Sequence, residues 1–300
     1  MKTIIIALLG IGQFLNSFSQ PNEGIREKPE NMEFVPEGTY NMKVIENNKT
    51  SDVSVQVSAL WMSNEITNKD YREFTDYIRS NPNRFLIVVE SEKIILNDSV
   101  NGTMKDSVIV KNVFIRYPDI LSGLIDSTIL EKENMIYKNY FTDEKYDNYP
   151  VVGVSYRNAV YYCLWKTEME NARLKQEGKP SISGYRLPTE DEWAYVASQP
   201  VMPSREKITG NDIRPSKKGI MNIFQLYNLS DNVAEWTSSY PKSIWRISNT
   251  NTEHLKQRIV RGGSWKTSPN INESAELDQD AKRNFIGFRI VRSVSLSGDK

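Results

Sequence analysis

The sequence predicts an irregular α+β domain in which much of the chain lies outside regular helices and strands. Three observations predict this class. Only a few segments have the spacing of an amphipathic helix, the strand-like runs are short, and glycine and asparagine interrupt the second half of the 300 residues. Hydrophobic residues make up 39% of the chain, which is enough for a core. No internal repeat of about 20–50 residues occurs, so a solenoid or propeller is excluded.

Three segments carry the start signal of a helix. Thr67 precedes the first, with Asp70 in place of the glutamate of a usual capping box. Ser155 precedes the second, whose apolar residues recur at helical spacing. Thr189 and Glu192 form a capping box at the third. We therefore expect three helices that begin directly after these residues.

The strand-like runs are expected in two regions of the first half. Residues 32–40 and 53–61 alternate between apolar and polar side chains, which is typical of half-buried strands. Two further runs, 85–89 and 107–115, flank a stretch rich in turn-forming residues. We expect these two runs to form a hairpin within an insertion at residues 84–145.

Two blocks near the C-terminus, RGGSW (261–265) and GFRIVR (287–292), are expected to form core strands. Their glycines allow another chain segment to approach closely. Arg261 and Arg289 are expected to make buried ion pairs or carbonyl contacts, because a buried charge needs a partner. Arg186 is expected to pair with one of the acids at the start of the third helix.

Composition excludes several kinds of function. The 38 basic and 38 acidic side chains balance, so nothing indicates a nucleic-acid partner. One cysteine, Cys163, and one histidine, His254, are too few for a zinc or copper site of the usual ligand count. Cys163 lies in a patterned helix and is expected to be a small buried hydrophobe. Ser264 has no histidine near it in sequence, so a serine hydrolase is not expected.

The N-terminus is typical of a signal peptide. Lys2 is followed by a mainly apolar run over residues 4–15, with small residues near position 19. That run is shorter than the ~20 residues of a membrane-spanning helix, and an uncleaved anchor helix is the alternative. We expect a signal peptide at 1–19, a flexible leader at 20–31 and a tail at 295–300. The apolar run lacks the following cysteine of a lipoprotein, so the protein is expected to be periplasmic or secreted without a direct membrane span.

The block NLSDNVAEWTSSY, residues 228–240, contains the candidate metal ligands. Asp231, Asn232 and Glu235 place three oxygen-bearing side chains within five positions around a predicted turn. Calcium prefers oxygen ligands, including the backbone carbonyls that a turn supplies. The alternative is an Asx turn in which Glu235 hydrogen-bonds to the backbone. The acids at 190–192 are expected to complement the helix dipole, with acid–base chemistry as the alternative.

Six blocks in order resemble the formylglycine-generating-enzyme-like family, also called the sulfatase-modifying-factor domain. They are SNEITNKDYREFTDYI, PVVGVSYRNAVYYCLW, GYRLPTEDEWAYVA, LYNLSDNVAEW, RIVRGGSW and IGFRIVR. The resemblance covers residues 32–294. It implies a single domain with an irregular fold related to C-type lectins, low in regular secondary structure and with a few helices around short antiparallel strands.

Further runs, among them YPDILSG and YFTDEKYDNYPVVGVSY, resemble one branch of that family. This branch is the gliding-motility and type IX secretion lipoproteins of Bacteroidetes, GldK/PorK and GldJ. The resemblance implies a structural component with protein partners in an outer-membrane or periplasmic secretion or motility complex. The absent lipoprotein cysteine and the shorter chain depart from that branch.

The resemblance also bears on metals and catalysis. Enzymes of the family carry a copper-binding cysteine pair just after the RGGS strand, but residues 266–271 read KTSPNI here. Without thiolates no copper is expected, and the resemblance implies a pseudoenzyme without catalytic or cofactor-binding residues. The family's calcium site carries over to Glu235 and, as further ligands, to Asp231, Asn232 and Val233. Calcium is therefore the one cofactor expected.

We expect a non-catalytic structural protein whose partners bind the insertion at 84–145, since functions are often added on insertions in a rigid scaffold. Two alternatives stay open. A cysteine-free enzyme would need a pocket with converging titratable groups, for example near Lys266, Arg289 and Glu276. A lectin-like binder would need a surface groove with an exposed Trp245 or Trp265.

Overall fold

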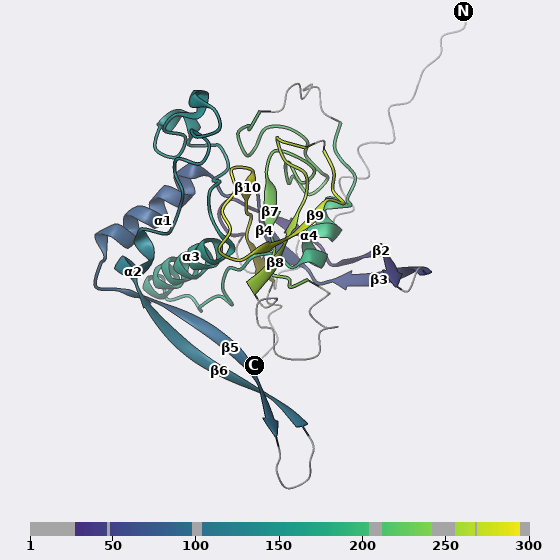
Figure 1. Ribbon diagram of the computed structural model, residues 1–300, viewed down its shortest axis with the longest axis horizontal. Helices are drawn as coiled ribbons and strands as arrows, with labels where there is room; N and C mark the ends of the chain where they lie inside the picture. Colours follow the sequence, from purple (N-terminus) through teal and green to yellow (C-terminus); the bar gives the residue numbers. More distant parts are fainter. Residues whose placement is uncertain are drawn as a thin grey trace, which may run out of the picture.

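The structure is a computed structural model that describes residues 28–46, 49–97, 104–203, 212–241, 256–267 and 269–294, with side chains outside 42–51 and 87–112. The arrangement of the helices and short sheets is shown in Figure 1. Their buried hydrophobic side chains form three clusters. The helical elements are α1 (Asn68–Ser80), α2 (Tyr117–Leu121), η1 (Met135–Tyr137), η2 (Glu144–Tyr146), α3 (Tyr156–Gln176) and α4 (Glu190–Ala197).

The strands are short, apart from two hairpins. They are β1 (Met32–Val35), β2 (Gly38–Glu46), β3 (Lys49–Val57), β4 (Leu60–Ser63), β5 (Phe85–Asn97), β6 (Met104–Arg116), β7 (Ala234–Trp236), β8 (Gln257–Arg261), β9 (Ser274–Asp278), β10 (Ile286–Gly287) and β11 (Val291–Ser293). They form one sheet in the order β1-β4-β11, a second in the order β10-β7-β8-β9, and the hairpins β2-β3 and β5-β6. The predicted α+β class is confirmed.

The three predicted helix starts are confirmed by complete capping boxes. Thr67, Ser155 and Thr189 are the N-caps of α1, α3 and α4, and each side chain accepts a hydrogen bond from the backbone three residues on. In each case the side chain at that later position accepts from the N-cap backbone in return. These local hydrogen bonds are encoded in four residues, which is why the sequence predicts them reliably.

The strand predicted over residues 53–61 is two strands, β3 and β4. Val57 pairs with Gly38 of β2, whereas Leu60 pairs with Val35 of β1. The segment that pairs with these residues is itself interrupted between β1 and β2 by Pro36, which cannot donate a backbone hydrogen bond. The break between β3 and β4 lies opposite the break between β1 and β2.

The strand predicted over residues 287–292 is likewise divided, between β10 and β11. Gly287 pairs with β7 in the second sheet, and Val291 pairs with Met62 of β4 in the first. Between β10 and β11, the backbone carbonyl of Ile290 accepts a hydrogen bond from the N–H of Ser63 in β4, and that of Phe288 accepts one from the N–H of Ile66. The chain therefore passes from one sheet to the other, and a single straight strand is not possible.

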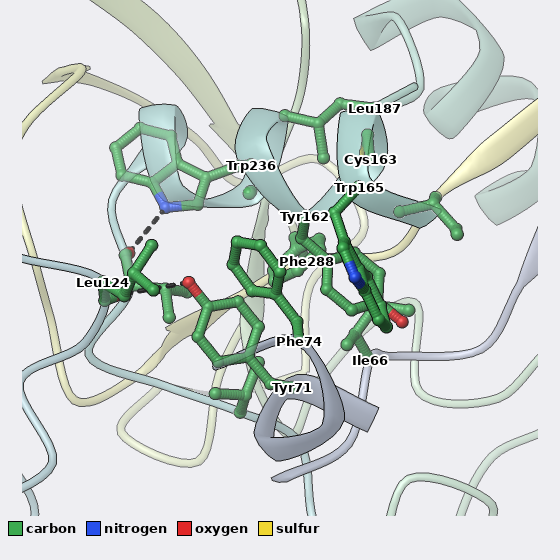
Figure 2. Packing of buried hydrophobic residues seen from close by; sticks show 14 of the residues in the cluster. Ile66, Tyr71, Phe74, Leu124, Tyr162, Cys163, Trp165, Leu187, Trp236 and Phe288 are labelled. Atoms are coloured by element: carbon green, nitrogen blue, oxygen red, sulfur yellow. Dashed lines mark hydrogen bonds between the residues drawn. The ribbon is translucent and has the colours of Figure 1, made fainter. Parts of the chain in front are cut away.

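Aromatic side chains form the core between α1 and α3 (Figure 2). The rings of Tyr71 and Tyr162 stack with centroids 5.8 Å apart, and Phe288 meets both edge-on. The Tyr71 hydroxyl donates to the carbonyl of Leu124 at 2.9 Å, and the Trp236 indole donates to Val154 at 3.1 Å. The buried hydroxyl of Tyr71 and the buried indole of Trp236 thus have partners, as burial requires.

The hairpin β5-β6 extends away from the rest of the molecule (Figure 1). Its strands pair in register from Phe85 with Arg116 to Asn97 with Met104, so both are longer than the sequence predicts. Leu86 anchors the base of the hairpin in the core, while Phe85 is 48% and Phe114 64% exposed. Among the described helices, none has the length and apolar character needed to cross a membrane.

Candidate functional site

A buried ion pair lies at the centre of the block that contains the predicted metal ligands. β7 places Glu235 beside Arg289, which follows β10, and the two strands are parallel neighbours. Arg289 donates from Nε to Oε2 at 2.6 Å and from Nη2 to Oε1 at 2.7 Å. The indole of Trp193 on α4 donates to the same Oε2 at 2.7 Å. Both carboxylate oxygens of Glu235 therefore have donors from the protein itself.

Asp231 and Asn232 precede β7 in a turn and face Arg214. The Arg214 guanidinium donates to Asp231 Oδ2 at 2.6 Å, and its backbone N–H donates to Asn232 Oδ1 at 2.8 Å. Asn232 has a positive φ of 66°, which asparagine tolerates better than most residues. The predicted turn is present, but Glu235 binds side chains rather than the backbone expected of the Asx-turn alternative.

A second buried carboxylate, Glu65, completes this polar cluster. The side-chain amides of Asn228 and Asn232 donate to Glu65 over 2.9–3.1 Å. Burial, and then the nearby negative charge of Glu235, raise the pKa of Glu65 to about 8. Arg289 lowers it only in part, because this guanidinium is already paired with Glu235.

The side-chain oxygens of the predicted calcium ligands mostly have protein donors in this arrangement. The Glu235 oxygens and Asn232 Oδ1 accept hydrogen bonds, whereas Asp231 Oδ1 and the neighbouring Asn228 Oδ1 are buried without a donor. Val233, whose side chain is packed in the core, could contribute only its backbone carbonyl. Within the described ranges, no three acidic, cysteine or histidine side chains are grouped to hold a metal ion.

The strand predicted over residues 261–265 is wrong beyond Arg261, because β8 ends there and the positive φ of Gly262 turns the chain out of the extended conformation. The end of β8 and Gly262 are tied to α4. Arg261 pairs with Glu190 at 3.2 Å and lies over the Trp193 ring. The expected ion pair is present, and it is partly rather than fully buried. Gly262 has a φ of 86°, and a Cβ atom there would lie 2.9 Å from Trp193. Arg186 pairs with Glu192 at 2.6 Å, also as expected. The acids of α4 therefore serve as ion-pair partners and helix caps.

The segment that begins at Trp265 is covered by the insertion at residues 84–145. Lys266 forms an ion pair with Glu133 at 2.6 Å, and this lowers the pKa of Glu133. The half-buried Trp265 packs on Tyr137 with centroids 6.2 Å apart, and its indole donates to the carbonyl of Asn284 at 3.1 Å. Residues of 84–145 thus close over the segment that follows the glycines.

Other sequence-predicted positions do not come together. Lys266 is bound to Glu133 and Arg289 to Glu235, while Glu276 is an exposed position on β9. Trp245 and His254 lie outside the described residues. Cys163 is buried as predicted, and burial raises the pKa of its thiol, so it is a poor nucleophile.

A family model described as the sulfatase-modifying factor enzyme 1-like domain matches residues 17–294. The chain belongs to this family. The bovine (Bos taurus) formylglycine-generating enzyme is 23% identical over 294 residues, which cover 79% of this chain. The bovine inactive C-alpha-formylglycine-generating enzyme 2 is 24% identical over 237 residues, which cover 67% of this chain.

This chain matches only part of the length of each of these relatives. It covers 66% of the bovine enzyme and 63% of its inactive counterpart. A serine/threonine-protein kinase pkn1 of Chlamydia caviae is 25% identical over 201 residues, which cover 60% of this chain and 29% of the kinase. Among solved structures, PvdO from Pseudomonas aeruginosa has a TM-score of 0.50 and 16% identity, with 90% of this chain and 97% of that chain covered. That likeness shows the fold.

Three functional side chains of the family fold were missed by sequence reasoning. Glu65 and Glu133 lie 167 and 133 positions away from their partners Asn232 and Lys266. Arg214 lies only 17 positions before Asp231, but in unpatterned sequence. Glu65 does belong to the block SNEITNKDYREFTDYI that carried the family resemblance. The sequence signal for Glu65 was an acidic residue just after the short apolar strand β4.

Proposed function

We propose that this chain is a non-catalytic member of the sulfatase-modifying-factor family that works as a structural or assembly protein. One observation carries the proposal: the segment that follows β8 has no cysteine and is closed by the insertion. Trp265 and Lys266 of that segment are bound to Tyr137 and Glu133 of the insertion. A substrate seated on this segment would have to displace both contacts.

The family also contains a relative whose name states that it is inactive, the bovine inactive C-alpha-formylglycine-generating enzyme 2. This supports the idea that the fold is retained where catalysis is lost. Glu235 and Arg289 are buried and paired with each other, so neither side chain is available to a substrate.

The proposed working surface is the hairpin β5-β6. Each strand has 13 residues, and within the described residues neither pairs with a third strand. An isolated two-stranded hairpin is only marginally stable in water, so covering it with a partner is favourable. The exposed Phe85 and Phe114 near its base add apolar contact area. A strand of a partner protein added to an open edge fits this geometry.

We further propose that the partners belong to a periplasmic, outer-membrane-associated secretion or gliding-motility complex. The support is the resemblance of runs such as YPDILSG to that branch, together with the predicted signal peptide at 1–19. Both are sequence observations, so the partners themselves must be identified by experiment.

The test shortens the hairpin without touching its base. Val89 and Asn112 are register partners, so residues 90–111 can be replaced by an Asn-Gly turn that joins them. Crosslinking pull-downs from native periplasm should lose outer-membrane secretion or motility components with this variant. Val201→Ser, a change at another side chain exposed by 63%, is the matched control and should retain them. Unchanged partners and unchanged secretion in the shortened variant would refute the proposal.

A further inference from the structure

A groove of about 810 Å³ lies along one face of α3, away from the polar cluster and from the insertion's contacts with the RGGSW loop. Its volume is within the range of small-molecule sites in proteins. The groove lies between α3, the segment that follows it, and Arg292 of β11. None of the residues discussed above as candidate ligands or catalytic groups lines it.

The floor of the groove is apolar. Trp165, Met169 and Ile182 line it, and the helical spacing of the first two places them on one face of α3. Trp165 is 8% exposed and its indole nitrogen is buried, so this side chain contributes apolar surface to the groove.

The rim of the groove is basic. Five lysine or arginine side chains and three glutamates line it. Three of the five cations are paired with carboxylates: Lys28 with Glu33, Arg173 with Glu170 and Glu177, and Lys179 with Glu177. Two cations converge on the ring of Tyr185, with Lys166 Nζ 5.7 Å and Arg292 Cζ 5.9 Å from its centroid. Two like charges on one neutral ring favour an anion between them.

We propose that this groove binds a small amphipathic carboxylate, with its aliphatic body on Trp165, Met169 and Ile182 and its carboxylate at Lys166 and Arg292. The apolar floor selects for the aliphatic chain, and the basic rim selects for the negative headgroup. This site does not depend on the hairpin or on the structural role proposed above, since it shares no residue with either.

The proposal is tested by titrating the full chain with decanoate, below the concentration at which it forms micelles, by isothermal calorimetry. Decyltrimethylammonium, which has the same chain and a positive headgroup, is the matched ligand. We expect one decanoate per protein and no comparable binding of the cation. Lys166→Met should weaken decanoate at least about tenfold, the size of one charge-assisted hydrogen bond. Met169→Trp, which fills the floor, should abolish binding.

Lys138→Met, at an exposed lysine of the insertion, is the control variant and should bind decanoate as the natural chain does. Circular dichroism of each variant verifies that it is folded. Absence of decanoate binding overturns the proposal. So does equal binding of both amphiphiles, or equal affinity in the Lys166 and Lys138 variants, because each of these outcomes indicates non-specific adsorption.

Discussion

Arg289 and Glu235 form a two-pronged ion pair from which water is excluded, with side chains 0% and 1% exposed. The remaining donors of Arg289 reach the backbone carbonyls of Ser63 and Tyr227 at 3.2 and 2.9 Å. One guanidinium therefore connects β4, the turn before β7, and β7 itself. Because the charges are buried, removing one partner leaves the other uncompensated.

We predict that Glu235→Gln lowers the free energy of unfolding by about 3–5 kcal/mol, the usual cost of breaking a buried pair. Urea denaturation measures it. The double variant Glu235→Leu with Arg289→Met removes both charges and should be more stable than Glu235→Gln alone. Glu177→Gln, which breaks an exposed pair with Arg173, is the control and should leave the denaturation midpoint in place. Equal loss in this control and in Glu235→Gln would contradict the prediction.

Calcium is predicted to have no effect on stability through Glu235, because Arg289 and Trp193 occupy both of its oxygens. The melting temperature should be the same in excess calcium and in excess EDTA. A ligand present at a hundred times its dissociation constant would add about 2.7 kcal/mol, which a thermal melt detects easily. A calcium-dependent rise that disappears in Glu235→Gln would show that the family's calcium site has formed here after all.

Stability is predicted to depend on pH through Glu65. Its pKa is raised from 4.5 to about 8 in the folded protein, so the folded state binds more protons than the unfolded state between these values. The contribution of the protonated group is therefore complete below about pH 4.5 and is lost as pH rises through about 8. Urea unfolding at pH 5, 6.5, 8 and 9 measures this loss.

The slope contributed by one such group approaches 1.4 kcal/mol per pH unit at most. Glu65→Gln should flatten the profile over this window, whereas Glu144→Gln, at an exposed position, should leave the slope as it is. An identical slope in the natural chain and in Glu65→Gln would rule out Glu65 as its source.

Gly262 is predicted to tolerate no side chain. Gly262→Ala combines an unfavourable positive φ of 86° with a Cβ 2.9 Å from Trp193 and 3.1 Å from the Leu229 carbonyl. Gly178 is the matched control, because its φ is 69° and nothing lies within 4 Å of a Cβ there. Gly178→Ala should therefore lower the free energy of unfolding by only about 1–2 kcal/mol, the cost of the left-handed backbone conformation for a residue with a Cβ atom.

Gly262→Ala should lower the free energy of unfolding by the same backbone cost and by a further amount of about 1–3 kcal/mol from overpacking against Trp193. Thermal and urea unfolding of the two variants side by side separates the contributions. If both variants lose the same free energy, the contact with Trp193 does not constrain this position.

The sequence alone determined the elements whose signals are local. The capping boxes at Thr67, Ser155 and Thr189 each need only four consecutive residues, and all three helices begin where predicted. The hairpin within 84–145 was predicted for the same reason, and the ordered blocks gave the family and its fold. The missing cysteines after RGGSW are also a property of the sequence alone.

Only the tertiary structure decided which partners the charged residues take. Glu235, expected from its own turn to bind calcium, faces Arg289 from 54 positions away, and Glu65 reaches Asn232 across 167 positions. The divisions between β3 and β4 and between β10 and β11 depend on distant partner strands as well. The physical reason is that a buried charge or backbone group is satisfied by whatever the folded chain brings near it, and sequence spacing carries no record of that.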